Sequence, residues 1–340
     1  MKFREEKDSM GKLNVPEDAL YGATTQRALL NFPISDLRFN RTFIKSIAEI
    51  KLCAAETNLE LGTLEKDLAD EIIKAAELVS KGDYDSEFVV DIFQTGSGTS
   101  TNMNTNEVIS NVAIKNIGGI IGSRDPIHPN DHVNKGQSSN DVVPTAIHIA
   151  GCVGIVESLI PGLEKLQKSL EKKSEEFWGV IKTGRTHLQD ATPIRLGQEF
   201  LGYSGQIEES IRRAKSSLDE LSVLALGGTA VGTGIGMQKG FSSKVIEKLS
   251  KRFKIQFSES PNHFHSQSTI DAIVASSGDL KTIAVSLMKI GNDIRWLGSG
   301  PRAGIGEIEL PEVQPGSSIM PGKVNPVIAE SLTMVCAQVI

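Results

Sequence analysis

The feature that most constrains the fold of this chain is a heptad pattern over residues 273–297. Apolar residues recur there seven apart, and a second set falls between them at three- and four-residue steps: Ile273, Leu280, Leu287 and Ile294, with Ile283, Ile290 and Leu297. Such a seam predicts a long helix that packs against other long helices at a shallow crossing angle. Seams of this kind are usually core, so we assign it no functional site.

Helical spacing of apolar residues recurs in other segments. It predicts helices over 41–61, 64–79 and 201–221, and a short one near 107–115. Pro144 suits the first turn of a further helix, which Pro161 is expected to kink or split. The first 40 residues or so are expected to be extended and loop-like. Because strands and helices do not alternate, the sequence predicts an all-α fold rather than a doubly wound sheet.

The composition excludes several functional classes. The chain has 340 residues, 39% of them hydrophobic and 23% charged, and a net charge of -6, so neither nucleic acid nor a membrane surface is an expected partner. No signal sequence and no run of about 18 apolar residues is evident, so we expect no spanning helix. Cys53, Cys152 and Cys336 lie far apart. Free thiols in a reducing cytoplasm are the expected state.

The loop over residues 316–326 is the strongest candidate site. It reads Gly-Ser-Ser-Ile-Met-Pro-Gly-Lys-Val-Asn-Pro, and an apolar helical run follows Pro326. Glycines allow backbone N–H groups to approach a ligand closely, and a helix N-terminus favours anions. The loop therefore predicts a site for a small carboxylate or phosphate, although a mobile surface loop has the same composition.

Two more polar stretches precede predicted helices. One contains Ser97, Gly98 and Thr99, and the other contains Ser138, Ser139 and Asn140. Their hydroxyls and amides suit a carboxylate, but the same residue types are favoured as helix caps. The second stretch also carries His128 and His132, four residues apart as in some metal sites. Pro129 argues against a helix there and no third ligand is evident, so we expect no metal.

A third polar stretch, residues 183–193, carries His187 beside Thr186. The histidine is either an acid/base group or a buried structural residue. Glu330 lies within one helical turn of Pro326, where it either pairs with a histidine or faces solvent. The glycine-rich segment 227–236 fits neither a dinucleotide nor a P-loop pattern, and we interpret it as a connection between helices. We assign no role to His263 or His265.

Taken together and in order, these loops resemble those of the fumarase/aspartase superfamily over essentially the whole chain. Histidine at position 187, glycine at 322 and the Ser-Ser-Asn at 138–140 are similar to class II fumarases rather than aspartases. The resemblance implies an all-α fold with a small N-terminal domain (1–135) and a long-helix bundle domain (136–340). It also implies a homotetramer with a helical core, active sites shared between subunits, fumarate and L-malate as ligands, and no metal or organic cofactor.

The resemblance also implies residue roles. Ser317 is the base that removes the carbon-bound proton, and Lys323, Asn325 and loop N–H groups stabilise the resulting aci-carboxylate. His187, paired with Glu330, serves the water side as general acid/base. The groups that hold the two carboxylates are Ser97, Gly98, Thr99, Ser138, Ser139, Asn140, Thr186 and Ser318, with Lys323 and Asn325. A secondary dicarboxylate site comprises His128, Pro129, Asn130 and Asp131.

Two departures from the family pattern stand out. Family members often carry a basic residue three before His128, where this chain has Asp125, with Arg124 one further back. We therefore expect the secondary site to bind anions weakly or not at all. Family chains also continue well past residue 340, so we expect an incomplete bundle domain and no C-terminal domain. Two alternatives remain: an aspartate ammonia-lyase of the same fold, and a catalytically silent structural member of the superfamily.

Overall fold

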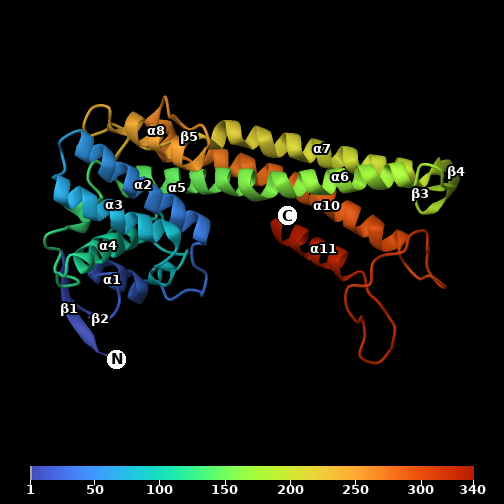
Figure 1. Ribbon diagram of the computed structural model, residues 1–340, viewed down its shortest axis with the longest axis horizontal. Helices are drawn as coiled ribbons and strands as arrows, with labels where there is room; N and C mark the ends of the chain where they lie inside the picture. The colour runs from blue at the N-terminus through green and yellow to red at the C-terminus, as the bar shows by residue number, and fades with distance from the viewer. Residues whose placement is uncertain (1) are drawn as a thin grey trace. The chain divides into compact units, whose positions relative to one another are not determined.

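The computed structural model describes residues 2–340, which form two compact units (Figure 1). Unit 1 comprises residues 2–154 and Asp219–Ile273, and unit 2 comprises Ile155–Leu218 and Val274–Ile340. Helices dominate both units. Among the described residues the strands form only three two-stranded sheets, which confirms the all-α prediction.

Unit 1 begins with an antiparallel hairpin of β1 (Phe3–Asp8) and β2 (Gly11–Pro16), followed by helix α1 (Ala23–Asn31). The sequence analysis missed this helix. Its first N–H groups have no cap from their own segment and instead bond to a distant carboxylate. Glu107 accepts from the N–H groups of Gly22, Thr24 and Thr25 at 2.9–3.0 Å. A cap supplied from another element leaves no local sequence signal.

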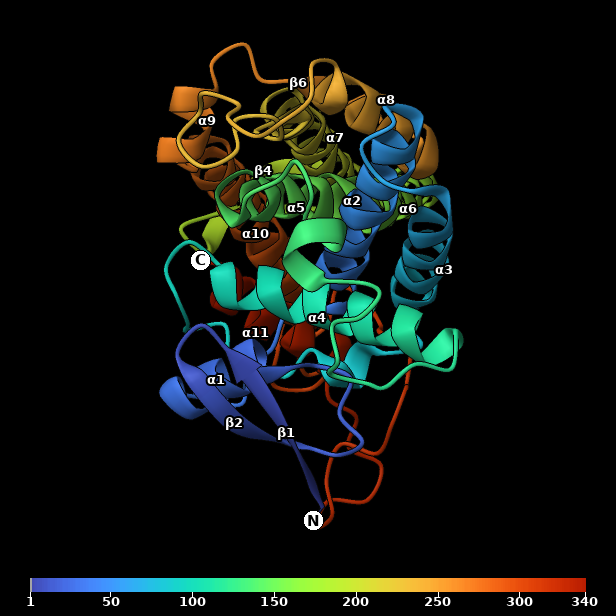
Figure 2. The same cartoon turned by 90° about the vertical axis from the view of Figure 1, so that its left-hand side faces the viewer.

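Helix α2 (Arg41–Glu60) forms the centre of unit 1 and packs against α3 (Lys66–Lys81), α5 (Ser139–Gly154) and α8 (Phe241–Phe253), as Figure 2 shows. It is buried along most of its length. The predictions for 41–61 and 64–79 are therefore confirmed. Unit 1 also contains the short η1 (Asp85–Glu87), β5 (Val223–Leu224) paired in parallel with β6 (Ser258–Glu259), and α9 (His263–Ser268).

Two helices of unit 1 begin earlier than predicted. Helix α4 runs over Thr99–Asn116, whereas the prediction placed a short helix near 107–115. The polar residues at its start are buried, and their side chains bond to neighbouring segments instead of ending the helix. Helix α5 begins at Ser139, so Pro144 lies inside it rather than in its first turn. Candidate site residues thus occupy the first turns of both helices.

The helix that starts at Ser139 changes character before Pro161. A π-helical turn, η3 (Ile155–Leu159), separates α5 from α6 (Ile160–Glu176), as expected for a proline that splits a helix. The helical stretch Ser139–Glu176 contains an 18-residue window with a mean hydropathy of 1.7, so it is long and apolar enough, by length and composition, to cross a membrane. The expectation that no such stretch exists was wrong on this criterion. The core helix of a soluble protein passes the same test.

Unit 2 is a bundle of long helices. Helix α6 lies beside α7 (Leu196–Leu221), and α7 lies beside α10 (Asp271–Leu297), through the contacts of Ser204 with Glu171 and of Tyr203 with Asp293 (Figure 1). The predictions over 201–221 and 273–297 are confirmed. A hairpin of β3 (Ile181–Thr186) and β4 (Gln189–Arg195) connects α6 to α7. The last helix is α11 (Val327–Val339), which Pro326 precedes as predicted.

Candidate active site

The candidate residues fall into two groups, one in each unit. Unit 1 holds Ser97, Gly98, Thr99, Ser138, Ser139 and Asn140, with the segment His128–Asp131. Unit 2 holds Thr186, His187, Ser317, Ser318, Lys323, Asn325 and Glu330.

In unit 1 the structure brings three candidate hydroxyls into one chain of hydrogen bonds. Ser97 Oγ and Thr99 Oγ1 lie 2.8 Å apart, and Thr99 Oγ1 lies 2.8 Å from Ser139 Oγ. Ser97 is exposed, whereas Thr99 and Ser139 are half-buried. Each hydroxyl both donates and accepts, so the chain can reorient toward a ligand oxygen without losing its internal bonds.

Gly98 permits this arrangement. Its φ of +70° lies in the left-handed region, which favours glycine. A Cβ at this position would lie 2.7 Å from Cγ1 of Val143 on α5. The absence of a side chain therefore allows the start of α4 to approach α5 closely enough for Thr99 and Ser139 to bond.

The residues at the start of α5 combine capping with the candidate site. Ser138 Oγ accepts from the N–H of Asn140 at 3.2 Å, as a capping hydroxyl does. The Nδ2 group of Asn140 donates one hydrogen to the carbonyl of Ala230 at 2.9 Å. Its second N–H and its Oδ1 are left for a ligand. The capping alternative is thus realised at Ser138.

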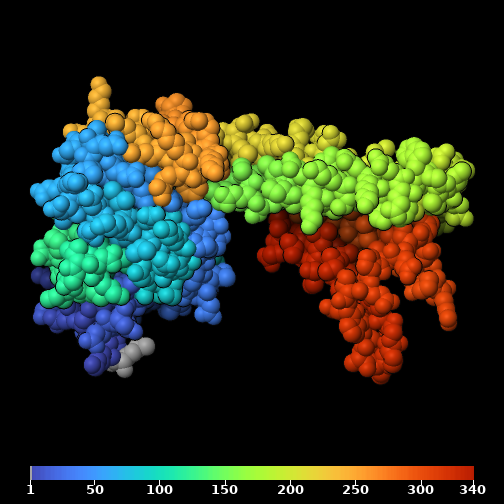
Figure 3. Space-filling model, viewed as in Figure 1, coloured from blue at the N-terminus to red at the C-terminus, as the bar shows by residue number. Residues whose placement is uncertain are grey.

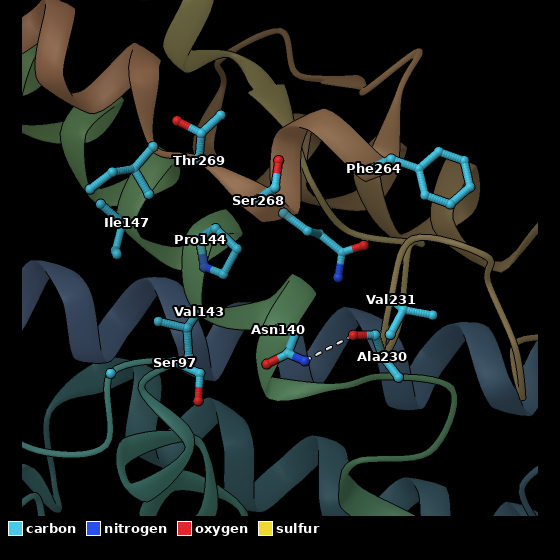
Figure 4. A pocket seen from close by; sticks show the side chains of 13 residues that line it. Ser97, Asn140, Val143, Pro144, Ile147, Ala230, Val231, Phe264, Ser268 and Thr269 are labelled. Atoms are coloured by element: carbon cyan, nitrogen blue, oxygen red, sulfur yellow. Dashed lines mark hydrogen bonds between the residues drawn. The ribbon is translucent and has the colours of Figure 1, made fainter.

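A pocket of about 410 Å³ opens beside this hydroxyl chain (Figure 4). Ser97 and Asn140 lie at one side, and Val143, Pro144 and Phe264 supply apolar walls. The size suits a small organic ligand. The sequence analysis missed the walls contributed by the segments around Val231 and 264–270, since nothing local marks those residues as neighbours of Ser97.

The segment over His128–Asp131 forms a compact turn. Contrary to the expectation drawn from Pro129, a π-helical turn, η2 (Pro129–Val133), lies here. His128 Nδ1 accepts from the N–H of Asp131 at 3.2 Å, and His132 Nδ1 accepts from the N–H of His128 at 2.9 Å. Burial lowers the pKa of His132. One nitrogen of each ring is therefore bonded to the backbone, and Asn130 and Asp131 are exposed.

In unit 2, Thr186 and His187 lie at the tip of the β3–β4 hairpin. Thr186 pairs with Gln189, so His187 and Leu188 form a two-residue loop. Their φ angles are +53° and +62°, as a type I′ turn requires. These are uncommon for residues other than glycine, and such strain is concentrated at functional sites. The polar stretch was predicted as a loop, and the structure shows that it is a hairpin.

Ion pairs fix the hairpin to the connection between α10 and α11. Arg185 and Lys182 both pair with Glu307, and Lys182 also pairs with Glu199 at 2.9 Å. Burial raises the pKa of the Glu307 carboxyl, but its bonds to Arg185 and Lys182 outweigh burial and lower it overall. Glu307 therefore remains an anion that holds the base of the hairpin.

The loop over 316–326 is closed by its own polar groups. The N–H of Gly316 donates to the Lys323 carbonyl at 2.8 Å, and Asn325 Nδ2 donates to the Gly316 carbonyl at 3.0 Å. A Cβ on Gly316 would lie 2.7 Å from that Lys323 oxygen, so only glycine fits. In Figure 3 the orange-red connection that carries this loop extends away from the bundle helices of unit 2.

Within this loop, backbone N–H groups point at Ser317. Its Oγ accepts from the N–H of Met320 at 3.2 Å and from the N–H of Ile319 at 3.3 Å. Ser317 is half-buried, whereas Ser318 and Lys323 are exposed. Two N–H donors on one hydroxyl oxygen favour its anionic form.

Glu330 lies in the first turn of α11, as predicted. Within residues 2–340 of this chain, the pairs between histidine and carboxylate involve His128, His263 and His265 but not His187. The pairing of His187 with Glu330 thus stays a prediction.

Comparison with known proteins places the chain in a family. The profile of a family described as "Lyase" matches residues 11–340. Fumarate hydratase class II of Rickettsia bellii is 52% identical over 99% of this chain and 73% of its own length. The mitochondrial fumarate hydratase of Danio rerio is 53% identical over 99% of this chain and 66% of its own. The chain thus spans about two thirds to three quarters of these relatives.

Solved structures give the same result. A class II fumarase from Schistosoma mansoni superposes with a TM-score of 0.96 and 43% identity, over 99% of this chain and 74% of the other. A fumarate lyase:delta crystallin from Brucella melitensis bound to cobalt superposes with a TM-score of 0.93 and 44% identity, over 100% of this chain and 74% of the other.

Proposed function

Since the chain belongs to the class II fumarate hydratase family of lyases, we propose that it catalyses the reversible addition of water to fumarate to give L-malate. The arrangement around Ser317 is the observation that carries the proposed mechanism. A serine hydroxyl is a weak acid, so it acts as a base only where its anion is stabilised. The N–H groups of Ile319 and Met320 supply that stabilisation.

In the malate-to-fumarate direction, Ser317 Oγ as alkoxide takes the proton from the carbon beside one carboxylate. The electron pair moves into that carboxylate and forms a dianionic aci-carboxylate, which needs positive charge where its own charge develops. Lys323 provides an ammonium, and Asn325, whose side chain closes the loop, provides an amide. His187 then protonates the departing hydroxyl as a general acid, with Glu330 raising the basicity of the ring.

The substrate carboxylates require neutral donors in addition. The hydroxyls of Ser97, Thr99 and Ser139, already joined in one chain, supply them in unit 1. Ser138, Asn140 and Gly98 shape that region, and Thr186 and Ser318 contribute from unit 2. Asn140 Nδ2 can donate its second hydrogen to a carboxylate while the first stays bonded to Ala230.

We propose further that the protein is a cytoplasmic homotetramer with active sites shared between subunits. Exposed apolar residues on the bundle helices support association, among them Leu201, Val274, Val285, Trp296 and Met334. The predicted domain boundary at residue 135 belongs to this proposal. So does a secondary dicarboxylate site at His128–Asp131 that is weak, since Asp125 repels anions.

The first test is the ultraviolet absorbance of purified protein with L-malate, with and without a chelator, and with L-aspartate in parallel. We expect fumarate to appear from malate alone and to be insensitive to the chelator. Fumarate from aspartate would identify an ammonia-lyase instead. A folded tetramer that is inactive on both and binds no dicarboxylate would support a structural member.

A matched pair of variants tests the role of Ser317. We expect Ser317→Ala to lower kcat by about 10²–10⁴, the range for a lost acid/base group. Ser331→Ala, which removes an exposed hydroxyl from α11, serves as the control and should retain wild-type activity. Equal activity of the two variants would remove Ser317 from the mechanism.

A further inference from the structure

A buried carboxylate lies directly behind the proposed carboxylate-binding residues of unit 1. Asp141 follows Asn140 in α5 and is 0% exposed. Its Oδ1 accepts from the N–H of Ser138 at 2.9 Å. A carboxylate at the third helical position that bonds back to the N-cap residue fixes the first turn of the helix.

The other oxygen of Asp141 reaches a segment far away in the sequence. Oδ2 accepts from the N–H of Gly227 at 3.1 Å and from the N–H of Thr229 at 3.0 Å. The carbonyl of Ala230, next in that segment, accepts from Asn140. One side chain therefore joins the start of α5 to the glycine-rich segment, and both line the pocket of Figure 4.

Three backbone N–H groups converge on the buried carboxylate of Asp141. Burial raises the pKa of Asp141, and the three N–H groups and Lys51 of α2 oppose this shift. Lys51 supports the same region from the other side, since its Nζ donates to Asn134 Oδ1 at 2.7 Å and to Gln137 Oε1 at 3.0 Å. The buried side chain of Lys51 thus holds Asn134 and Gln137, which lie just before Ser138.

We propose that Asp141 is a positioning residue for dicarboxylate binding: it holds the Ser138–Asn140 turn and the Gly227–Ala230 segment in register, so that Ser139, Thr99 and Asn140 face the ligand together. This inference rests on the proposed function, because it takes those side chains to bind the carboxylates. Positioning of this kind acts on the bound substrate and on the transition state alike. Its loss therefore raises KM and changes kcat little.

The test is Asp141→Asn, which keeps the size of the side chain but places an NH₂ group against backbone N–H donors. Fumarate kinetics are measured together with the Kd of succinate, a saturated dicarboxylate that cannot be hydrated, by titration calorimetry. We expect KM and Kd each to rise about tenfold, which corresponds to about 1.4 kcal/mol, while kcat changes little. Wild-type KM and Kd in this variant would overturn the proposal.

Glu107→Gln is the matched control. Glu107 is also a buried carboxylate that accepts from three backbone N–H groups, but those belong to Gly22, Thr24 and Thr25, which are not proposed to bind substrate. We expect it to lose thermal stability and to keep the wild-type KM and Kd. A rise in Kd equal to that of Asp141→Asn would reduce the role of Asp141 to general stability and overturn the proposal.

A measurement on the unaltered protein covers the case in which Asp141→Asn does not fold. Saturating succinate should slow amide hydrogen exchange at Ser138, Gly227 and Thr229, but not at Gly22 or Thr25. Unchanged exchange at the first three amides would refute the positioning role. Failure of the proposed function is separate, because it would appear as a wild-type protein that does not form fumarate from malate.

Discussion

Replacement of Lys51 by methionine should change how stability depends on pH. Lys51 is completely buried in the middle of α2. Burial lowers the pKa of its ammonium to about 7, although the charge of Asp141 opposes the shift. An unfolded lysine has a pKa of about 10.4. Between these values the unfolded chain binds a proton that the folded chain releases.

The sign and size of the effect follow from this difference in bound protons. The free energy of unfolding rises with pH wherever the unfolded state binds more protons. The cost of burying Lys51 is therefore present in full below pH 7 and is relieved as the pH approaches 10. With a folded pKa of about 7, the relief between pH 7 and pH 9 is about 2 kcal/mol. Methionine cannot titrate, so the free energy of unfolding of Lys51→Met should lack this rise between pH 7 and pH 9.

The assay is urea unfolding of wild type and Lys51→Met at pH 7 and pH 9, at one protein concentration. The variant also loses two hydrogen bonds, but that loss is the same at both pH values and cancels in the comparison. Lys74→Met, on an exposed face of α3, is the control and should run parallel to wild type. If the stability difference between wild type and Lys51→Met were the same at both pH values, Lys51 would not titrate as we infer.

Two further predictions concern the β3–β4 hairpin, and both are measured by urea unfolding. Leu188 has a positive φ, which costs a residue other than glycine about 1–2 kcal/mol. Leu188→Gly should therefore raise the free energy of unfolding, and Leu188→Val should lower it. The opposite order would exclude backbone strain at the tip of the hairpin. Glu307→Gln removes the partner of Arg185 and Lys182 and should cost about 1–3 kcal/mol; an unchanged midpoint would show that the pairs do not stabilise the hairpin.

The long helices could be predicted from the sequence because their apolar spacing is sustained over many residues. The heptads of α10 and the spacing in α2 and α7 mark faces that must be buried whatever their partners are. Shorter elements escaped prediction for a physical reason. Helix α1 receives its cap from Glu107, which lies 85 positions after Gly22 in the sequence. The β3–β4 hairpin turns at His187 and Leu188, which carry no turn signal.

The candidate site likewise contains residues that could be predicted from the sequence and residues that could not. Its loops could be recognised from their residue types, and the structure joins Ser97, Thr99 and Ser139 as one hydroxyl chain. The supporting residues could not be found from spacing. Asp141 matters because it bonds to Gly227, which lies 86 positions away. A lysine within the apolar run of α2 was the one local signal for Lys51, since a buried ammonium must have polar partners.

The close approach at Gly98 also bears on how this site can evolve. Any other residue at position 98 must adopt a left-handed backbone conformation, and its Cβ would lie 2.7 Å from Cγ1 of Val143. A smaller residue at 143 relieves the collision but not the backbone strain, so no single substitution opens a neutral path away from glycine. Ser97, which is exposed, carries no such coupling. Selection for altered ligand preference can therefore substitute position 97 freely, whereas a change at position 98 also requires a change at Val143 on α5.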